Sequence, residues 1–179
     1  MPQAYAVRWP KFAKRGLEDV KTSVNSRFED GVPIVISDQM QSGCGVGEGR
    51  LRALIVDDSA VMRKVIERAL HQAGLELTEV LQASNGEEAL QMLRDNRAAS
   101  TPLALILSDI NMPVMDGLQF LEMRRQENLA EGVPVVMITT EGNETFVLRA
   151  IAAGAQGYIC KPFTAEQVKV RVLPLLRAA

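Results

Sequence analysis

Three carboxylates in this sequence stand at the ends of apolar runs, where they could do chemistry together. Asp57 and Asp58 follow "LRALIV", and Asp109 ends "LALILSD". Capping explains one acid at a helix start, because the acid accepts hydrogen bonds from unpaired backbone N–H groups, but it does not explain a pair. Like charges held close together need a cation among them, and clustered carboxylate oxygens suit Mg²⁺. The three acids therefore predict a magnesium site if the fold brings them together.

Two further motifs carry complementary groups. "VVMITT" ends in Thr139 and Thr140, which offer hydroxyls, and "GYICKPF" carries Lys161 before Pro162. An acid cluster with a metal, a hydroxyl and an ammonium is typical of a phosphoryl site, with Asp109 as the nucleophile. Taken singly, the lysine fits a surface residue, the threonine a β-branched strand end and the proline a turn. Their joint placement after successive apolar runs favours the functional interpretation.

The elements that position these residues follow a regular alternation. From residue 51 onward, apolar strand-like runs alternate with amphipathic helix-like runs, which is typical of parallel α/β architecture. The predicted strands are Leu51–Val56, Leu77–Gln82, Leu103–Ser108, Val133–Ile138 and Gln156–Cys160. The predicted helices are Ala60–Ala73, Gly86–Asn96, Gly117–Asn128, Glu144–Ala153 and Ala165–Leu176. These units are too few to close an eight-fold barrel, so we expect an α/β, doubly wound, five-stranded parallel sheet with helices on both faces.

The strand order 2-1-3-4-5 decides whether the acids meet. In this order the first and third strands are neighbours at the switch point, and ligands bind beyond their carboxyl ends. Asp57 and Asp58 leave the first strand there, and Asp109 leaves the third. We therefore expect the three carboxylates to converge on one cation, with Thr139 and Lys161 arriving from the fourth and fifth strands.

Composition excludes several classes of protein. The apolar fraction of 47% and the charged fraction of 23% are those of a globular domain, and no apolar run is long enough to cross a bilayer. The net charge of -2 argues against a nucleic-acid surface as the main theme. Cys44 and Cys160 lack metal-ligand spacing and no secretory signal is evident, so we expect a cytoplasmic protein without a disulfide framework.

The first fifty residues break the alternation. They end in the glycine-rich "QSGCGVGEGR", so we expect residues 1–50 to be a largely disordered tail before a domain at 51–179. An alternative is that translation starts later, near Met40 or Val46. Within the tail, a strand at Val32–Ile36 and a short amphipathic docking helix are further alternatives. The apolar residues of that helix are Leu17, Val20, Val24 and Phe28.

Four motifs, each at an expected strand end, carry a family resemblance: "LIVDDS", "SDINMPVMDG", "VVMITTE" and "GAQGYICKPF". With them the predicted domain resembles the receiver domain of bacterial two-component response regulators, of the single-domain, CheY-like kind. The resemblance implies a (βα)5 fold with Asp109 as the phosphoacceptor and Lys161 as the phosphate partner. It implies Mg²⁺ bound by Asp58, Asp109 and the backbone carbonyl of Asn111, with Asp57 often acting through water.

The resemblance also implies a partner and a switch. A histidine kinase or phosphotransfer protein presents a phosphorylated imidazole, and the Asp109 carboxylate attacks its phosphorus while Mg²⁺ offsets the charge. Phosphorylation then draws in the Thr139 hydroxyl and lets Tyr158 turn inward, which shifts the population toward an active form. The output face consists of the fourth helix, fifth strand and fifth helix of the domain. Its candidate contact residues are Glu144, Phe146, Val147, Tyr158 and Arg171.

Other residues near the site bear on the lifetime of the phosphoryl group. Asn111 and Glu141 lie two residues beyond the phosphoacceptor and the switch threonine, the same pair of types as in the chemotaxis regulators, and this pair favours quick hydrolysis. Thr140 opposes that trend, because it is bulkier than the alanine often found there and narrows water access. The single histidine, His71, has no phosphotransfer motif around it, so another molecule must supply the phosphoryl group.

Other classes of protein fit the residues less well. A haloacid-dehalogenase phosphatase places a second aspartate two residues after its nucleophile, where this chain has Asn111. A flavodoxin-like carrier cradles a phosphate with its first loop, which the acids of "VDDSAV" would repel. A pseudo-receiver would be expected to lack an acid or the lysine. We expect a signalling protein in chemotaxis or another pathway, with a phosphorelay intermediate or a phosphate sink as alternatives, and no direct contact with nucleic acid or membrane.

Overall fold

The computed structural model describes residues 28–29, 32–33, 51–98, 101–140 and 144–178. The chain divides into two units, residues 1–36 and 37–179. In the first unit, β1 (Phe28–Glu29) pairs antiparallel with β2 (Val32–Pro33). The helix predicted to include Phe28 is therefore wrong at that residue, because its backbone pairs with Pro33 instead. The rest of the predicted tail lies outside the described residues, and the domain start at residue 51 stays a prediction.

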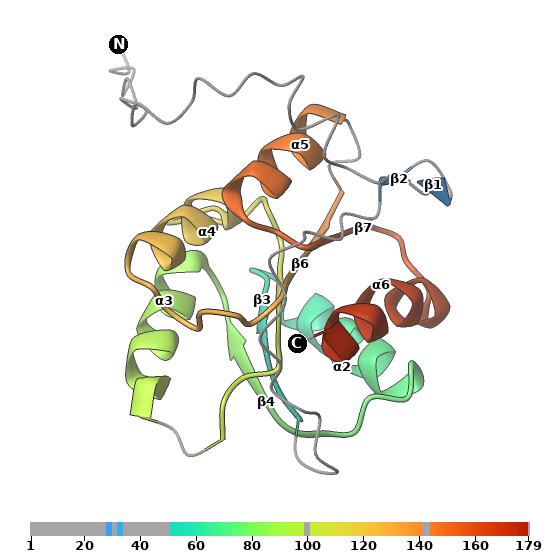
Figure 1. Ribbon diagram of the computed structural model, residues 1–179, viewed down its shortest axis with the longest axis horizontal. Coiled ribbons are helices and arrows are strands. Elements are labelled where there is room, and N and C mark those ends of the chain that lie inside the picture. Colours follow the sequence, from blue (N-terminus) through green and yellow to red (C-terminus); the bar gives the residue numbers. More distant parts are fainter. Residues whose placement is uncertain (1–27, 30–31, 34–50, 99–100, 141–143, 179) are drawn as a thin grey trace. The chain divides into compact units, whose positions relative to one another are not determined.

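The second unit contains one parallel five-stranded sheet. Its strands are β3 (Leu51–Val56), β4 (Leu77–Ala83), β5 (Leu105–Ser108), β6 (Val135–Thr139) and β7 (Gly157–Cys160). They lie in the order β4-β3-β5-β6-β7, and every neighbouring pair is parallel (Figure 1). This is the predicted order 2-1-3-4-5, and it places β3 beside β5.

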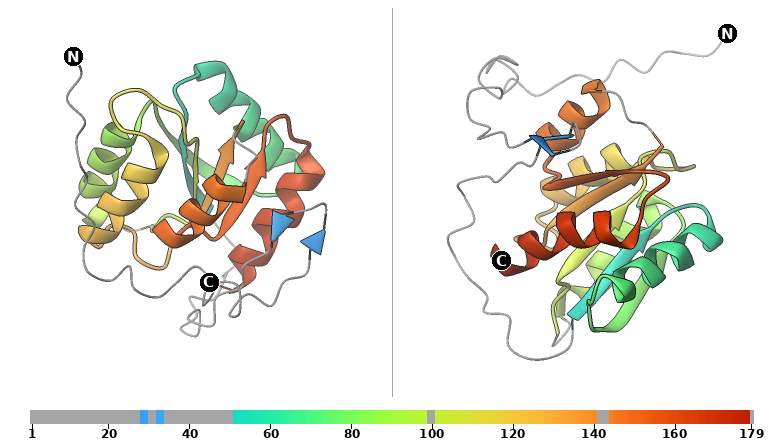
Figure 2. Two further views of the ribbon diagram at one scale, coloured as in Figure 1. Left: turned by 90° about the horizontal axis from the view of Figure 1, so that it is seen from above. Right: turned by 90° about the vertical axis from the view of Figure 1, so that its right-hand side faces the viewer.

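Helices cover both faces of the sheet. They are α2 (Ala60–Gln72), α3 (Gly86–Asp95), α4 (Gly117–Gln126), α5 (Glu144–Ala153) and α6 (Ala165–Ala178), with a short 3₁₀ turn, η1 (Asn96–Ala98), after α3. α2 and α6 pack on one face, and α3, α4 and α5 lie on the other (Figure 2). The predicted doubly wound α/β fold is confirmed. No helix in the described part of the chain is long and apolar enough to span a membrane.

The central apolar runs form strands that are buried on both faces, whereas the edge strand β4 is mostly half-buried or exposed. Ala53, Leu54, Ile55 and Val56 of β3 are all fully buried, as expected for a central parallel strand between two helical layers. The main core lies between the sheet and the pair α2 and α6. Its members include Ile55, Ile66, Leu70, Leu107, Val136, Val168 and Val172.

Helix starts lie immediately beyond the carboxyl ends of the strands. Ser59 caps α2 through its hydroxyl, which accepts from the Met62 N–H at 3.3 Å. Asn85 caps α3, and Asp116 forms a capping box with Gln119 at the start of α4. Because Ser59 is the cap of α2, neither Asp57 nor Asp58 is needed for that role.

Two buried arginines organise the opposite edge of the sheet. Arg52 of β3 donates to Asn96 Oδ1 at 2.9 Å and to Thr101 O at 2.6 Å, and it pairs with Glu79. Arg124 of α4 donates through Nη2 to two loop carbonyls, Ala130 O at 2.6 Å and Val133 O at 2.8 Å. Both guanidinium groups therefore hold loops that lead into strands.

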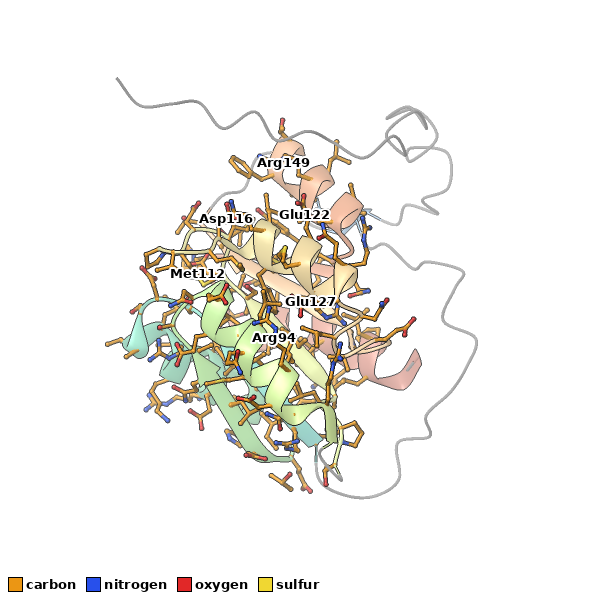
Figure 3. The ribbon with its side chains drawn as sticks, turned by 90° about the vertical axis from the view of Figure 1, so that its left-hand side faces the viewer. Arg94, Met112, Asp116, Glu122, Glu127 and Arg149 are labelled. Atoms are coloured by element: carbon orange, nitrogen blue, oxygen red, sulfur yellow. The ribbon has the colours of Figure 1, made fainter. Side chains whose placement is uncertain are left out.

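The surface of α3 and α4 on the same side carries a further ion pair. Arg94 donates both Nε and Nη2 to Glu127, at 2.9 and 2.7 Å, and the two side chains lie next to each other in Figure 3. The pair raises the pKa of Arg94 and lowers that of Glu127. It ties the end of α4 to α3, next to the loop that Arg124 holds.

Candidate functional site

Asp57 is held in place by each of its polar groups. It directly follows β3 and is 1% exposed. Its N–H donates to Ala83 O at 3.1 Å, at the end of β4, and its carbonyl accepts from Arg63 Nη1 at 2.7 Å. Its Oδ1 accepts from the Ser59 N–H at 2.8 Å, and Oδ2 accepts from Lys161 at 2.7 Å. The side chain therefore has a fixed direction at the carboxyl edge of the sheet.

Asp109 is fixed by the neighbouring strand. Its N–H donates to Val56 O at 2.8 Å, which places it beside the end of β3. Its Oδ1 accepts from two backbone amides, Ile110 N at 2.6 Å and Asn111 N at 3.3 Å. Like Asp57, Asp109 is buried, at 8% exposure, whereas Asp58 is exposed. The acids thus combine one surface group with two interior ones.

Gly117, the first residue of α4, lets the helix approach Asp109 closely. Its N–H donates to Ile110 O at 2.9 Å. A Cβ at Gly117 would lie 2.0 Å from the Asp109 carbonyl oxygen and 2.9 Å from Met137 Cε. The first distance is far below van der Waals contact, so this position requires glycine for the loop to hold Asp109 where it lies.

Lys161 reaches the acids from β7. Its Nζ donates to Asp57 Oδ2 at 2.7 Å and to Asp109 Oδ2 at 2.6 Å. Its backbone N–H donates to Thr139 O at 2.8 Å, and the bond to Pro162 is cis. Burial alone would lower the pKa of Lys161, but the hydrogen bonds and charges of Asp109 and Asp57 outweigh it and raise that pKa. Lys161 is therefore a permanent cation at neutral pH.

The three acids fit a divalent cation. Carboxylate oxygens of Asp57, Asp58 and Asp109 lie within 4.8 Å of one another. One ammonium against three carboxylates leaves an excess of negative charge, and oxygen ligands of this kind suit Mg²⁺. The cluster also contains a fixed cation, Lys161, on the side of Asp57 and Asp109. A carboxylate flanked by a cation site and an ammonium can accept a group that carries negative charge, such as a phosphoryl group.

The remaining predicted residues lie around this centre. Thr139 ends β6 and is fully buried, and Tyr158 of β7 is 5% exposed. Asn111 is exposed beside Asp109. Val147 of α5 is 6% exposed, so its side chain belongs to the core more than to a contact surface. Arg171 of α6 and Phe146 of α5 are half-buried, Glu144 begins α5, and Glu141 lies outside the described residues.

Sequence patterns did not point to two groups of contacts at this site. The backbone amides of Ile110 and Asn111 hold an oxygen of Asp109, and Arg63 of α2 holds the carbonyl of Asp57. Every residue except proline has a backbone amide, so side-chain types do not indicate which amides bind Asp109. Arg63 had one signal, its position one helical turn after the cap Ser59, from which a long side chain reaches back over the turn.

Comparison with known proteins decides the family. Residues 53–173 match the family described as the response regulator receiver domain. The chain belongs to this family. The receiver domain is 38% identical to the chemotaxis protein CheY1 of Helicobacter pylori over 122 residues. This alignment covers 68% of this chain and 94% of that protein. It is 36% identical over 126 residues to the chemotaxis protein CheY homolog of Campylobacter jejuni, covering 70% of this chain and 92% of the relative.

Solved structures agree with the receiver fold. The chemotaxis protein CheY4 of Vibrio cholerae matches with a TM-score of 0.58 and 34% identity, covering 70% of this chain and all (100%) of that one. A CheX-CheY-BeF3-Mg²⁺ complex from Borrelia burgdorferi contains a chain that matches with a TM-score of 0.60 and 28% identity, covering 70% and 88%. The receiver domain is thus homologous to CheY, a class of signalling proteins rather than conventional enzymes.

Proposed function

We propose that this receiver domain acts as a response regulator that accepts a phosphoryl group on Asp109 from a histidine kinase and signals through phosphorylation-dependent protein contacts, in chemotaxis or motility. The observation that carries the proposal is the setting of Asp109. Its Oδ2 is 2.6 Å from the Lys161 ammonium, and its carboxylate lies with those of Asp57 and Asp58 in a cluster of three acids, here called the acid trio. The similarity to chemotaxis proteins of two organisms supports the pathway.

The proposed transfer is an in-line displacement at phosphorus. An oxygen of Asp109 forms the new P–O bond while the P–N bond to the donor imidazole breaks, and its electron pair returns to the ring. A Mg²⁺ ion held by Asp57, Asp58, Asp109 and the Asn111 carbonyl would neutralise charge on the phosphoryl oxygens. Lys161, already beside Asp109, pairs with the transferred group, and Thr139 supplies a hydroxyl at the end of the next strand.

The proposed output follows from the two elements next to the site. The Thr139 carbonyl accepts from the Lys161 N–H at 2.8 Å, so β6 and β7 are joined at the phosphoryl end. Movement of Thr139 toward a phosphorylated Asp109 would repack Tyr158 and change the surface of α5, which begins at Glu144, of β7 and of α6, which carries Arg171. The CheX-CheY complex from Borrelia burgdorferi supports an output by protein contact.

Hydrolysis of the acyl phosphate would end the signal. We assign its rate to Asn111 and Glu141, which follow the phosphoacceptor and Thr139 by two residues. Asn111 is exposed beside Asp109, so its side chain faces the solvent from which the attacking water comes.

Intact mass spectrometry tests the proposal directly. The purified protein is exposed to acetyl phosphate with and without Mg²⁺, beside Asp109→Asn and the control Asp95→Asn, which changes an exposed acid of α3. We expect one phosphoryl adduct on the parent and on the control, only with Mg²⁺, and none on Asp109→Asn. A folded parent that forms no adduct with acetyl phosphate or with a phosphorylated histidine kinase would overturn the proposal in favour of a pseudo-receiver.

A further inference from the structure

We propose that Arg63 is a positioning residue for the cation site of Asp57, Asp58 and Asp109. It holds the backbone of Asp57 against the end of β4 and thereby sets the direction of Asp57 and Asp58. The inference rests on the proposed function. Arg63 lies on α2 and is not one of the three acids. In the described part of the chain, it makes no hydrogen bond to a side-chain oxygen of Asp57, Asp58 or Asp109. Its Nη1 donates to the Asp57 carbonyl at 2.7 Å, and its Nε donates to Gln82 Oε1 at 3.2 Å.

These two bonds complete a two-point attachment of Asp57. Its N–H donates to Ala83 O at 3.1 Å, and its carbonyl is joined through Arg63 to Gln82, the residue before Ala83. Both backbone polar groups of Asp57 are therefore tied to the last residues of β4. Rotation of the peptide that follows Asp57 would break the second attachment, and that peptide carries Asp58.

Gln82 is itself held in place. Its Nε2 donates to Glu67 Oε2 at 3.2 Å, and Glu67 also accepts from Lys64 at 2.8 Å. The chain of contacts from Glu67 through Gln82 to Arg63 keeps the guanidinium plane in one orientation. An outer contact network of this kind is how proteins orient the residues that bind a metal.

The residue type matters at this position. Arg63 lies one turn after Ser59, whose carbonyl accepts from the Arg63 N–H at 3.0 Å, and helical side chains lean toward the N-terminus. The guanidinium therefore lies over the strand-to-helix turn and offers Nε and Nη1 to two acceptors at once. A lysine ammonium in the same place can hold one of them with less directional control.

Charge and geometry predict opposite results, which makes the role testable. Removal of a positive charge near three carboxylates strengthens their attraction for Mg²⁺ through space. Loss of the clamp lets the Asp57–Asp58 peptide move and weakens binding. A purely electrostatic role therefore predicts tighter Mg²⁺ binding in Arg63→Gln, and a positioning role predicts weaker binding.

The experiment measures Mg²⁺ affinity by NMR titration, with the Ser59 amide as the reporter. The variants are Arg63→Gln, Arg63→Lys and the control Arg68→Gln, which removes an exposed charge from the same helix. We expect about tenfold weaker binding in Arg63→Gln, at the lower end of the effect of residues that orient metal ligands, partial rescue in Arg63→Lys and the parent affinity in Arg68→Gln. Unchanged or tighter binding in Arg63→Gln would overturn the inference.

A second readout needs no metal. In the metal-free protein, we expect hydrogen exchange at the Ser59 and Asp57 amides to be faster in Arg63→Gln than in the parent, with the α6 amides unchanged. Exchange at the parent rate at both amides would contradict the clamp. If Arg63→Gln does not fold, Gln82→Leu releases Nε alone and should weaken Mg²⁺ binding by a smaller factor, whereas parent affinity there would overturn the inference. Failure of the proposed function appears separately, as a parent protein that forms no Mg²⁺-dependent adduct.

Discussion

The two edges of the sheet bury charge in opposite ways. At the edge where strands begin, the buried charges are Arg52 and Arg124, and their N–H groups are directed at loop carbonyls, at Asn96 and at Glu79. At the edge where strands end, the buried charges are Asp57 and Asp109, which share one ammonium and lie beside a third carboxylate. At the first edge the hydrogen-bonded N–H groups all point at groups of the chain itself, although Arg124 Nε is buried without a partner among the described residues. At the second edge one ammonium lies among three carboxylates, an arrangement that suits a further cation.

This difference separates structural from functional use of buried charge. A guanidinium directed at carbonyls has its hydrogen bonds within the fold, so it holds loops and offers little to a ligand. A surplus of carboxylates keeps a repulsion that a bound cation relieves, so stability at that edge is coupled to ligand binding. The comparison predicts that removing a charge changes stability in opposite directions at the two edges.

The largest effect is expected at Arg124. Arg124→Leu leaves the Ala130 and Val133 carbonyls without their donor, and we expect a loss of about 2 to 3 kcal/mol in the free energy of unfolding, as for other buried groups deprived of a partner. Urea unfolding measures it. The adjacent Arg125 is exposed, and Arg125→Leu should change stability by less than about 0.5 kcal/mol. Loss of the Mg²⁺-dependent adduct in folded Arg124→Leu would contradict the separation of the two edges.

The opposite sign is expected at Asp58. Its carboxylate lies within 4.8 Å of those of Asp57 and Asp109, while Lys161 pairs with the other two. Without Mg²⁺, Asp58→Asn should raise the free energy of unfolding by about 1 kcal/mol, because one repulsive charge is removed. With Mg²⁺ the parent should gain stability and the variant little. Thermal unfolding with and without Mg²⁺ measures both, and a destabilised metal-free Asp58→Asn would show that the acids are satisfied without a cation.

The fold was predictable because its signals are local. The strand predicted over Leu51–Val56 has those bounds in the structure, since charged residues end the apolar run. β5 begins two residues later than predicted, at Leu105, although Ala104 N still donates to Arg52 O at 2.8 Å. α6 runs through Pro174 to Ala178, two residues past its predicted end at Leu176.

The candidate site was predictable only in part, for a physical reason. Convergence of the three acids and Lys161 follows from parallel strands ending at one edge, which strand order alone determines. The clamp by Arg63 and the close approach at Gly117 depend on side-chain direction and on backbone spacing between elements. Residue types along one strand or helix do not contain the spacing at Gly117. For Arg63 they give only its place one turn after Ser59, not the two acceptors that its guanidinium meets.

The smallest effect is expected at Val114, in the loop between Asp109 and α4. Left-handed residues occur at both edges of the sheet, and the arginine edge includes Ala130 with φ of 48°. Val114 has φ of 68° and is 84% exposed, so it is a β-branched residue in a strained conformation with little burial in return. We expect Val114→Gly to raise the free energy of unfolding by about 0.5 to 1 kcal/mol. Glycine removes the penalty of the left-handed conformation, but part of that gain is lost because glycine also gives the unfolded chain more conformational freedom.

The matched variant Val114→Ala identifies the origin of that strain. Alanine removes both γ-methyl groups but keeps a Cβ, which is the atom that clashes in the left-handed region. Urea unfolding of the two variants should therefore show a smaller gain for alanine than for glycine. Equal gains would assign the strain to the branched side chain rather than to the handedness of the backbone. At the other edge, Ala130→Gly removes only a Cβ. Its change in the free energy of unfolding should therefore contain no contribution from a branched side chain.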